Sequence, residues 1–192
     1  MIRTAPKVNN LLGIDPQDAA VVVNFEEASA SQKRRDSYES HRQRVFALAF
    51  YMTGGEMEAE EILGNTFIRA FRQAKEPSGE LVDRSLVTEL QRHVEFEPVR
   101  AEPQPLAMPP APAQKLEHRN VKRPDLEAAL VHLPATERLV FLLRDVEGYT
   151  VDRVAATLEI SPQAVSIALL RARLKLLQVL AALPRQQEAI AV

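Results

Sequence analysis

The stretch YTVDRVAATLEISPQAVSIALLRARLKL, residues 149–176, decides the fold of this chain. Its first helix begins after Thr150, whose hydroxyl suits an N-cap because it accepts a hydrogen bond from a free N–H of the first turn. After a short connection, Ser161 and Pro162 form the cap and first turn of a second helix. Ala155 is small enough to let the two helices cross closely. The pattern predicts a helix-turn-helix, although an ordinary helical hairpin would share it.

Two shorter helices are expected just before this unit, and together they predict a small domain over residues 125–184. Asp125 caps the first of them, which runs through His132. Pro134 suits the first turn of the second, which ends at Gly148. The apolar positions of that second helix are Leu139, Val140, Leu142, Leu143 and Val146.

Apolar residues at helical spacing also predict a first domain over residues 37–96. A helix begins near Tyr38 and stops at Gly54. A second helix spans about residues 56–73 and carries glutamates in its first turns, where the helix dipole favours negative charge. A third, weaker helix ends near Val94. Three helices form a minimal bundle.

The remaining segments lack apolar periodicity. Residues 97–124 hold seven of the 13 prolines, which predicts a linker of polyproline character. Residues 1–36 are expected to form a partly ordered N-terminal arm, and residues 185–192 a C-terminal tail. The expected fold class is therefore all-α, with two small helical bundles joined by a Pro-rich linker and a helix-turn-helix in the second.

The composition supports a helical protein and argues against an enzyme. Only 5% of the 192 residues are aromatic and six are glycine, so folds with many tight turns are poorly supported. Cysteine is absent and the four histidines are scattered, so we expect no metal site and no cofactor. A glycine-rich phosphate loop and a nucleophile-base set are also missing.

Two further properties bear on location and partners. The first residues lack a long apolar run after basic residues, so we expect a cytoplasmic protein with no membrane partner. The net charge is −2, which is not typical of a protein that binds nucleic acid tightly by itself. Any contact with DNA must come from a local patch or from a larger assembly.

The second domain carries a series of short motifs. They are Leu133-Pro134, Arg138, Val140-Phe141-Leu142, Glu147-Gly148-Tyr149-Thr150, Val154-Ala155, Leu158, Ile160-Ser161, Ala164-Val165 and Arg171-Ala172-Arg173. This series resembles region 4 of bacterial RNA polymerase sigma factors of the extracytoplasmic-function (ECF) type. In that family region 4 reads the minus-thirty-five promoter element.

A second series lies in the first domain, from His41 to Arg72. It consists of Arg44-Val45, Leu48-Ala49, Thr53-Gly54, Ala59-Glu60-Glu61 and Thr66-Phe67-Ile68-Arg69-Ala70-Phe71. This series is similar to region 2 of the same family, which holds the polymerase clamp and melts the minus-ten element. The two series together cover roughly half of the chain.

The resemblance implies two partners, the RNA polymerase core and promoter DNA, and leaves room for a regulatory anti-sigma factor. The residues expected at the polymerase are Glu60, Glu61, Asn65 and Arg69. The residues expected at DNA are Gln163, Ser166, Arg171, Arg173 and Lys175.

The sequence departs from the family pattern in three places. Gly64-Asn65 stands where the family has Gln-Glu, and glycine inside a helix costs about 1 kcal/mol relative to alanine. No aromatic residue lies between Phe71 and Phe96, where the family has rings that trap unstacked bases. In the last helix, Ser166-Ile167-Ala168 replaces the family's Lys-Ser-Arg stretch, which removes two cations.

These departures leave two functions open. One is a sigma factor that delivers polymerase to a promoter. The other is a sigma-like interaction protein that binds an anti-sigma factor or another helical partner in place of DNA. The second draws support from apolar residues on the expected outer face of the last helix, which we expect a protein surface to cover. They are Ile167, Leu170, Leu174 and Leu177, the first three being the predicted partner-binding residues.

Overall fold

The structure is a computed structural model that describes residues 16–99 and 121–182, with side chains from residue 28 onward. Its helices are α1 (Pro16–Thr53), α2 (Glu56–Gln73), α3 (Gly79–His93), α5 (Arg123–Leu130), α6 (Ala135–Phe141), the π-helical turn η1 (Leu142–Val146), α7 (Val151–Leu158) and α8 (Pro162–Ala182). No strand occurs within these two ranges. The all-α prediction is confirmed. The expected tail at 185–192, residues 1–15 of the arm and residues 100–120 of the linker lie outside the described residues.

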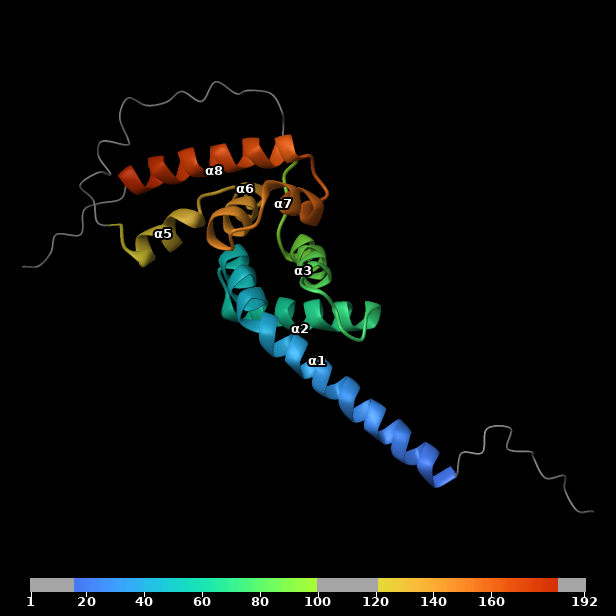
Figure 1. Ribbon diagram of the computed structural model, residues 1–192. Coiled ribbons are helices and arrows are strands. Elements are labelled where there is room, and N and C mark those ends of the chain that lie inside the picture. Colours follow the sequence, from blue (N-terminus) through green and yellow to red (C-terminus); the bar gives the residue numbers. More distant parts are fainter. Residues whose placement is uncertain (1–15, 100–120, 183–192) are drawn as a thin grey trace, which may run out of the picture.

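Helix α1 is longer than the sequence pattern indicated, since it begins at Pro16 and not near Tyr38. Residues 17–53 contain neither glycine nor proline, so nothing in this stretch terminates a helix, and Pro16 itself is well suited to a first turn. The helix ends as expected, because Gly54 adopts a φ of 81°, which glycine reaches without steric cost. Figure 1 shows the N-terminal part of α1 projecting away from the other helices.

Helices α2 and α3 complete the first bundle at the positions that the pattern predicted. Ser78 caps α3 by accepting a hydrogen bond from the N–H of Leu81 at 3.3 Å. Both helices pack on the C-terminal part of α1. The large side chains of this core are Val45, Leu48, Met52, Ile62, Phe67, Leu86 and Leu90, all buried.

The second bundle differs from the prediction in two details. Helix α5 begins at Arg123, so Asp125 is not the N-cap; its carboxylate instead accepts a hydrogen bond from the N–H of Lys122 at 3.2 Å. The helix that follows Pro134 is regular only in α6, and its last turn, η1, is π-helical. Periodicity in the sequence does not separate these two hydrogen-bonding patterns over a single turn.

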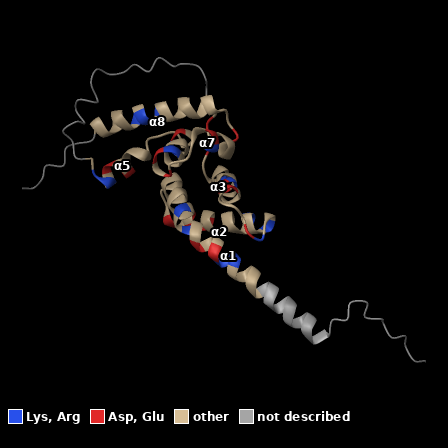
Figure 2. Cartoon of the chain, in the orientation of Figure 1, with Lys and Arg blue, Asp and Glu red and all other residues tan. Residues whose placement is uncertain are grey.

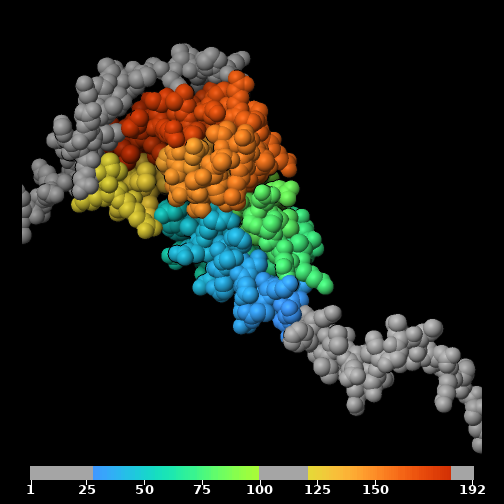
Figure 3. All heavy atoms as spheres, in the orientation of Figure 1, coloured from blue at the N-terminus to red at the C-terminus, as the bar shows by residue number. Residues whose placement is uncertain are grey.

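The two bundles lie directly against each other. Figure 3 shows the atoms of the second bundle in contact with those of the first, without a gap between them. Helix α3 packs against α7, and α1 packs against α6. Helix α8 runs across the far side of the second bundle, above α5, α6 and α7 (Figure 1). The helix-turn-helix is therefore anchored to the first bundle through its first helix, α7.

Candidate nucleic-acid interface

The helix-turn-helix forms through the capping residues that the sequence indicated. The Thr150 hydroxyl accepts a hydrogen bond from the N–H of Arg153 at 3.2 Å, and that of Ser161 accepts one from the N–H of Ala164 at 3.1 Å. Between the helices, Glu159 takes a left-handed conformation with a φ of 55°. A residue in this conformation ends a helix tightly, so α8 starts directly after the turn.

Helix α8 buries Val165, Leu169, Ala172 and Leu176, which lie opposite the expected outer face. Gln163 and Ser166 are exposed on its N-terminal turns. Ala168 is fully buried, although it stands where the resembling family has an arginine. One of the two cations that the sequence lacks relative to the family pattern therefore falls at a buried position of α8.

The three cations of α8 have different surroundings. Arg173 forms a two-pronged ion pair with Asp145 of η1, with nitrogen-to-oxygen distances of 2.8 and 2.7 Å. Arg171 is half-buried and Lys175 is exposed. Both positive charges act on Glu137. The pKa of Glu137 is raised, because burial raises it by more than Arg171 and Lys175 lower it. Figure 2 shows the basic residues in the middle of α8, while its end next to α7 carries none.

The outer face of α8 is partly covered by the chain itself. Leu170 is 54% exposed, whereas Ile167, Leu174 and Leu177 are half-buried. Their role as partner-binding residues stays a prediction.

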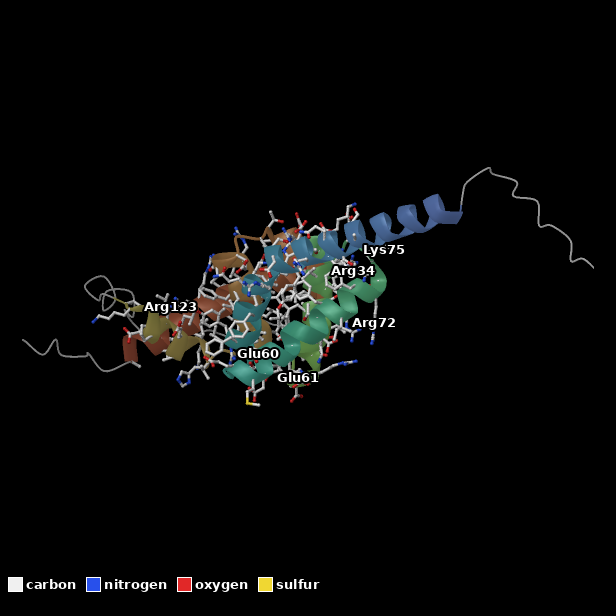
Figure 4. All side chains as sticks on the ribbon, turned by 90° about the horizontal axis from the view of Figure 1, so that it is seen from below. Arg34, Glu60, Glu61, Arg72, Lys75 and Arg123 are labelled. Carbon is white, nitrogen blue, oxygen red and sulfur yellow. The ribbon has the colours of Figure 1, made fainter. Side chains whose placement is uncertain are left out.

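The residues expected to meet polymerase lie on α2. Glu60 and Glu61 are exposed and, in Figure 4, both lie near the N-terminal part of this helix. Asn65 is half-buried. Arg69 is held inside the bundle, because its guanidinium lies 2.6 Å from a carboxylate oxygen of Glu89, which is buried on α3. Glu60 and Glu61 are therefore available to a partner, while Arg69 also fastens α2 to α3.

A groove of 660 Å³ runs between α1 and α2 beside Glu60. Its other lining residues are Tyr38, Glu39, Arg42, Gln43, Phe46, Leu63 and Gly64. Gly64 is exposed, and a Cβ added there would meet no heavy atom within 4 Å. Packing therefore does not require a glycine at position 64. The absence of a side chain there leaves this side of the groove open.

Sequence reasoning missed a buried polar network that joins the two bundles. Asp83 of α3 is 2% exposed. Its carboxylate lies 2.6 Å from the guanidinium of Arg44 in α1 and 2.9 Å from that of Arg153 in α7. It also accepts a hydrogen bond of 2.8 Å from the hydroxyl of Tyr149. We call these four residues the Asp83 network.

Tyr149 is the centre of this network on the second bundle. Arg153 stacks over its ring, 3.6 Å from the ring centroid, and Arg44 donates a hydrogen bond of 2.5 Å to its hydroxyl. Burial and the neighbouring Asp83 carboxylate raise the pKa of Tyr149 to about 12. The phenol therefore stays protonated at neutral pH and donates its proton to Asp83.

One signal in the sequence could have revealed Asp83. It lies three residues before Leu86, on the same face of α3 as the stripe Leu86, Leu90 and Val94. A carboxylate on the buried face of a helix needs charged or hydrogen-bonding partners, because an isolated buried charge is very costly. The partners themselves, Tyr149 and Arg153, lie too far along the chain to be found by spacing.

Arg138 makes a second link between the bundles. Its guanidinium donates hydrogen bonds to the carbonyl oxygens of Met52 at 3.0 Å and of Leu133 at 3.0 Å. Carbonyl groups at a helix C-terminus lack partners within the helix, so a cation is favourable at the end of α1. Nearby, Tyr51 of α1 donates a hydrogen bond to Glu127 and accepts one from Arg123.

The described residues contain neither a metal-binding cluster nor a membrane-spanning helix. No three His, Cys, Asp or Glu side chains within residues 16–99 and 121–182 are grouped so as to hold a metal ion. Over the same part of the chain, no helix has the length and apolar character that crossing a bilayer requires.

Comparisons with known proteins agree with the geometry. Residues 123–176 match the family model of sigma-70, region 4. Over 182 residues, the chain is 28% identical to the ECF RNA polymerase sigma factor SigE of Mycolicibacterium smegmatis, an alignment that covers 88% of this chain and 71% of that protein. The family model contains the whole helix-turn-helix, and the longer alignment extends the likeness to the first bundle.

Proposed function

Because this chain belongs to the RNA polymerase sigma factors of the ECF type, we propose that it directs the polymerase core to promoters and starts transcription there. The observation that carries the proposal is the unit of α7 and α8, a helix-turn-helix inside the range that matches region 4. In this unit the second helix enters the major groove of DNA, and its N-terminal residues reach base edges.

The polar residues of α8 suit this role. Gln163 and Ser166 are exposed at the N-terminal turns and are the groups proposed to reach base edges. Arg171, Arg173 and Lys175 follow further along, where we propose that they contact phosphates. Phosphate contacts position the protein but carry little sequence information, so any specificity of α8 rests on its first two turns.

The polymerase contact is proposed for α2. Glu60 and Glu61 offer two exposed carboxylates on α2, and Glu60 lines the groove between α1 and α2. Asn65 lies one turn further along the helix and extends the same surface. A carboxylate pair of this kind suits a basic patch on the partner, and such pairs govern the rate and specificity of association.

We further propose two functional domains, over residues 37–96 and 125–184, with residues 97–124 as the linker between them. The role is that of a DNA-bound specificity factor and involves no chemistry of its own. It places the protein in the cytoplasm, where the polymerase meets the chromosome.

The decisive experiment measures binding of the full chain to purified core polymerase, with and without promoter DNA, by fluorescence anisotropy. Promoters come from selection of random DNA with the assembled enzyme. We expect core binding, and then enrichment of a two-part sequence. Replacement of Glu60 and Glu61 by lysine should weaken core binding, while Glu95→Lys, a matched change at an exposed position outside α2, should not. A chain that binds neither core nor DNA contradicts the proposal.

Exposure of Leu170 favours a second candidate, a sigma-like protein whose α8 binds an anti-sigma factor or another helical partner. At 54% exposed, Leu170 lies beside the half-buried Ile167 and Leu174, and together they offer an apolar surface where DNA would otherwise lie. Under this candidate, Leu170→Glu abolishes capture of the helical partner but leaves core binding unchanged. If the chain instead directs polymerase to promoters, the same variant weakens promoter binding.

A further inference from the structure

The outer face of α2 carries an acidic residue, a glycine, an apolar residue and a basic residue at regular spacing. Glu60, Gly64, Ile68 and Arg72 are four residues apart, so they form one continuous ridge along the helix. All four positions are exposed. In Figure 4, Glu60 lies toward the start of α2 and Arg72 toward its end. The ridge therefore has an acidic end and a basic end, with a gap and an apolar side chain between them.

This order is complementary to itself when the helix is reversed. If two copies of α2 lie antiparallel with Gly64 of one level with Ile68 of the other, Glu60 of each copy is level with Arg72 of the other, because both pairs are centred on residue 66. Packing such ridges side by side is the most common way in which two helices cross, with their axes at about 50°. A two-fold axis forms every contact twice.

The gap at Gly64 has room for the side chain of Ile68. A Cβ added at Gly64 would meet no heavy atom within 4 Å, and the groove of 660 Å³ between α1 and α2 runs beside it. Ile68 is 51% exposed in the single chain, so its insertion into the gap of another copy would remove apolar surface from water. Met57 is 83% exposed and would lie near Arg72 of the other copy, whose aliphatic stem can cover it.

The charges of the ridge are not used inside the chain. Within residues 28–99 and 121–182, neither Glu60 nor Arg72 has an ion-pair partner, whereas the neighbouring Arg69 is paired with buried Glu89. The helix dipole favours acidic residues at the start and cations at the end of any helix, but it does not account for an exposed isoleucine and a glycine between them. A parallel copy would meet like charges at both ends, while an antiparallel copy meets opposite charges at both.

From these observations we propose that the ridge of α2 is a self-association surface, through which two copies of this chain form an antiparallel, two-fold dimer. One helix from each copy makes a contact at the small end of specific interfaces, so the dimer is weak and reversible. Resting on the proposed function, the dimer also regulates the polymerase contact. It covers Glu60, so self-association and core binding exclude each other, and each weakens the other by mass action.

The test reverses charges in the full chain and measures its mass by sedimentation equilibrium from micromolar to millimolar concentration. Arg72→Glu places carboxylates against carboxylates at both ends of the dimer, and Glu60→Arg places guanidinium groups against guanidinium groups. Each variant alone should associate about tenfold more weakly than the parent, because each change acts twice in a symmetric dimer. The matched controls are Arg84→Glu and Glu95→Arg, the same reversals at exposed positions outside α2.

An equal mixture of Arg72→Glu and Glu60→Arg is the sharpest part of the test. In a mixed dimer every ridge contact again joins opposite charges, so association should return to the level of the parent chain. Ile68→Ser should weaken association without affecting its dependence on charge, and circular dichroism checks that each variant stays folded. A parent chain that stays monomeric, variants that associate like their controls, or a mixture that stays as weak as its components would each overturn the proposed dimer.

A second measurement separates the dimer from the function on which its regulatory role rests. If the parent chain associates but no chain binds core polymerase, the proposed function is wrong and the self-association surface stands. If the parent chain binds core but stays monomeric at every concentration, the function stands and the surface is wrong. If both occur, saturating core should yield complexes with one chain each, and a complex holding two chains would overturn the mutual exclusion.

Discussion

Helices α3 and α8 are the two segments for which the family resemblance implies contact with DNA, and they have very different surroundings in the structure. Helix α8 lies on the outside of the second bundle and exposes Gln163 and Ser166 (Figure 1). Helix α3 lies between the bundles and has no aromatic side chain. The packed chain therefore exposes the N-terminal turns of α8, whereas seven residues of α3 are buried and this helix packs on α1, α2 and α7.

The two helices also hold their charged side chains differently. The Asp83 carboxylate of α3 is 2% exposed and has two guanidinium partners. On α8, Arg173 is 52% exposed in its pair with Asp145. Buried charges depend strongly on their partners, while exposed pairs contribute only about 0 to 1 kcal/mol. Substitutions on α3 and on α8 should therefore differ in the size of their effect on the free energy of unfolding.

The largest effect is expected for Asp83→Ala. This change leaves Arg44, Arg153 and the Tyr149 hydroxyl without their shared acceptor inside the interface. Removing one partner from a buried charged group costs about 3 to 5 kcal/mol, so we expect the free energy of unfolding to fall by about 3 kcal/mol. Urea denaturation followed by circular dichroism measures it. Asp145→Ala is the exposed counterpart, and an equal loss in both variants would contradict the comparison.

A smaller effect is expected from alkaline pH through Tyr149. Its pKa is raised from 10.0 to about 12, so the packed state favours the protonated phenol. This contribution is complete below pH 10 and is lost as the pH rises from 10 through 12, up to about 2 kcal/mol. Unfolding measured between pH 9 and about pH 12 should show this loss in the parent chain and a smaller one in Tyr149→Phe. Identical pH profiles of the parent chain and Tyr149→Phe would show that another group causes the loss of stability.

On α8, the expected effects concern binding to DNA more than folding. Arg173→Ala should lower the slope of binding affinity against salt by about one unit if this side chain meets a phosphate. Asp145→Ala should strengthen binding severalfold, because Arg173 no longer has to leave a carboxylate. Fluorescence anisotropy with duplex DNA at several salt concentrations measures both. Unchanged slopes in Arg171→Ala, Arg173→Ala and Lys175→Ala would place the phosphate contacts on another surface.

The contrast between α3 and α8 also explains what the sequence could reveal. The caps at Thr150 and Ser161 and the inward stripe of α8 depend on residues close together in sequence, and all were predicted correctly. The start of α1 was missed because residues 17–37 show no helical periodicity of apolar residues that would mark it. The π-helical turn was missed because it changes hydrogen bonds without changing which residues are apolar.

Contacts between the bundles could not be predicted, because they join residues 66 to 105 positions apart, such as Asp83 with Tyr149 and Arg44 with Tyr149. No local pattern in the sequence encodes such a pairing. The ion pair of Arg69 shows the same limit. Its ion pair with buried Glu89, 20 residues away, depends on how α2 and α3 pack.

The smallest effect on stability is expected for a substitution on the exposed surface of α2. Gly64 lies in the middle of this helix, and a methyl group there would meet no atom within 4 Å. Gly64→Ala should therefore raise the free energy of unfolding by about 0.5 to 1 kcal/mol, since alanine restricts the unfolded chain and favours the helix. Thermal denaturation measures this gain.

Because Gly64 also lines the groove beside Glu60, core binding of the same variant shows whether polymerase uses that groove. Weaker binding by a more stable protein would mean that the partner approaches the helix backbone at Gly64, whereas unchanged binding would confine the contact to the exposed carboxylates. A loss of stability would instead show that the backbone of α2 needs glycine at this position.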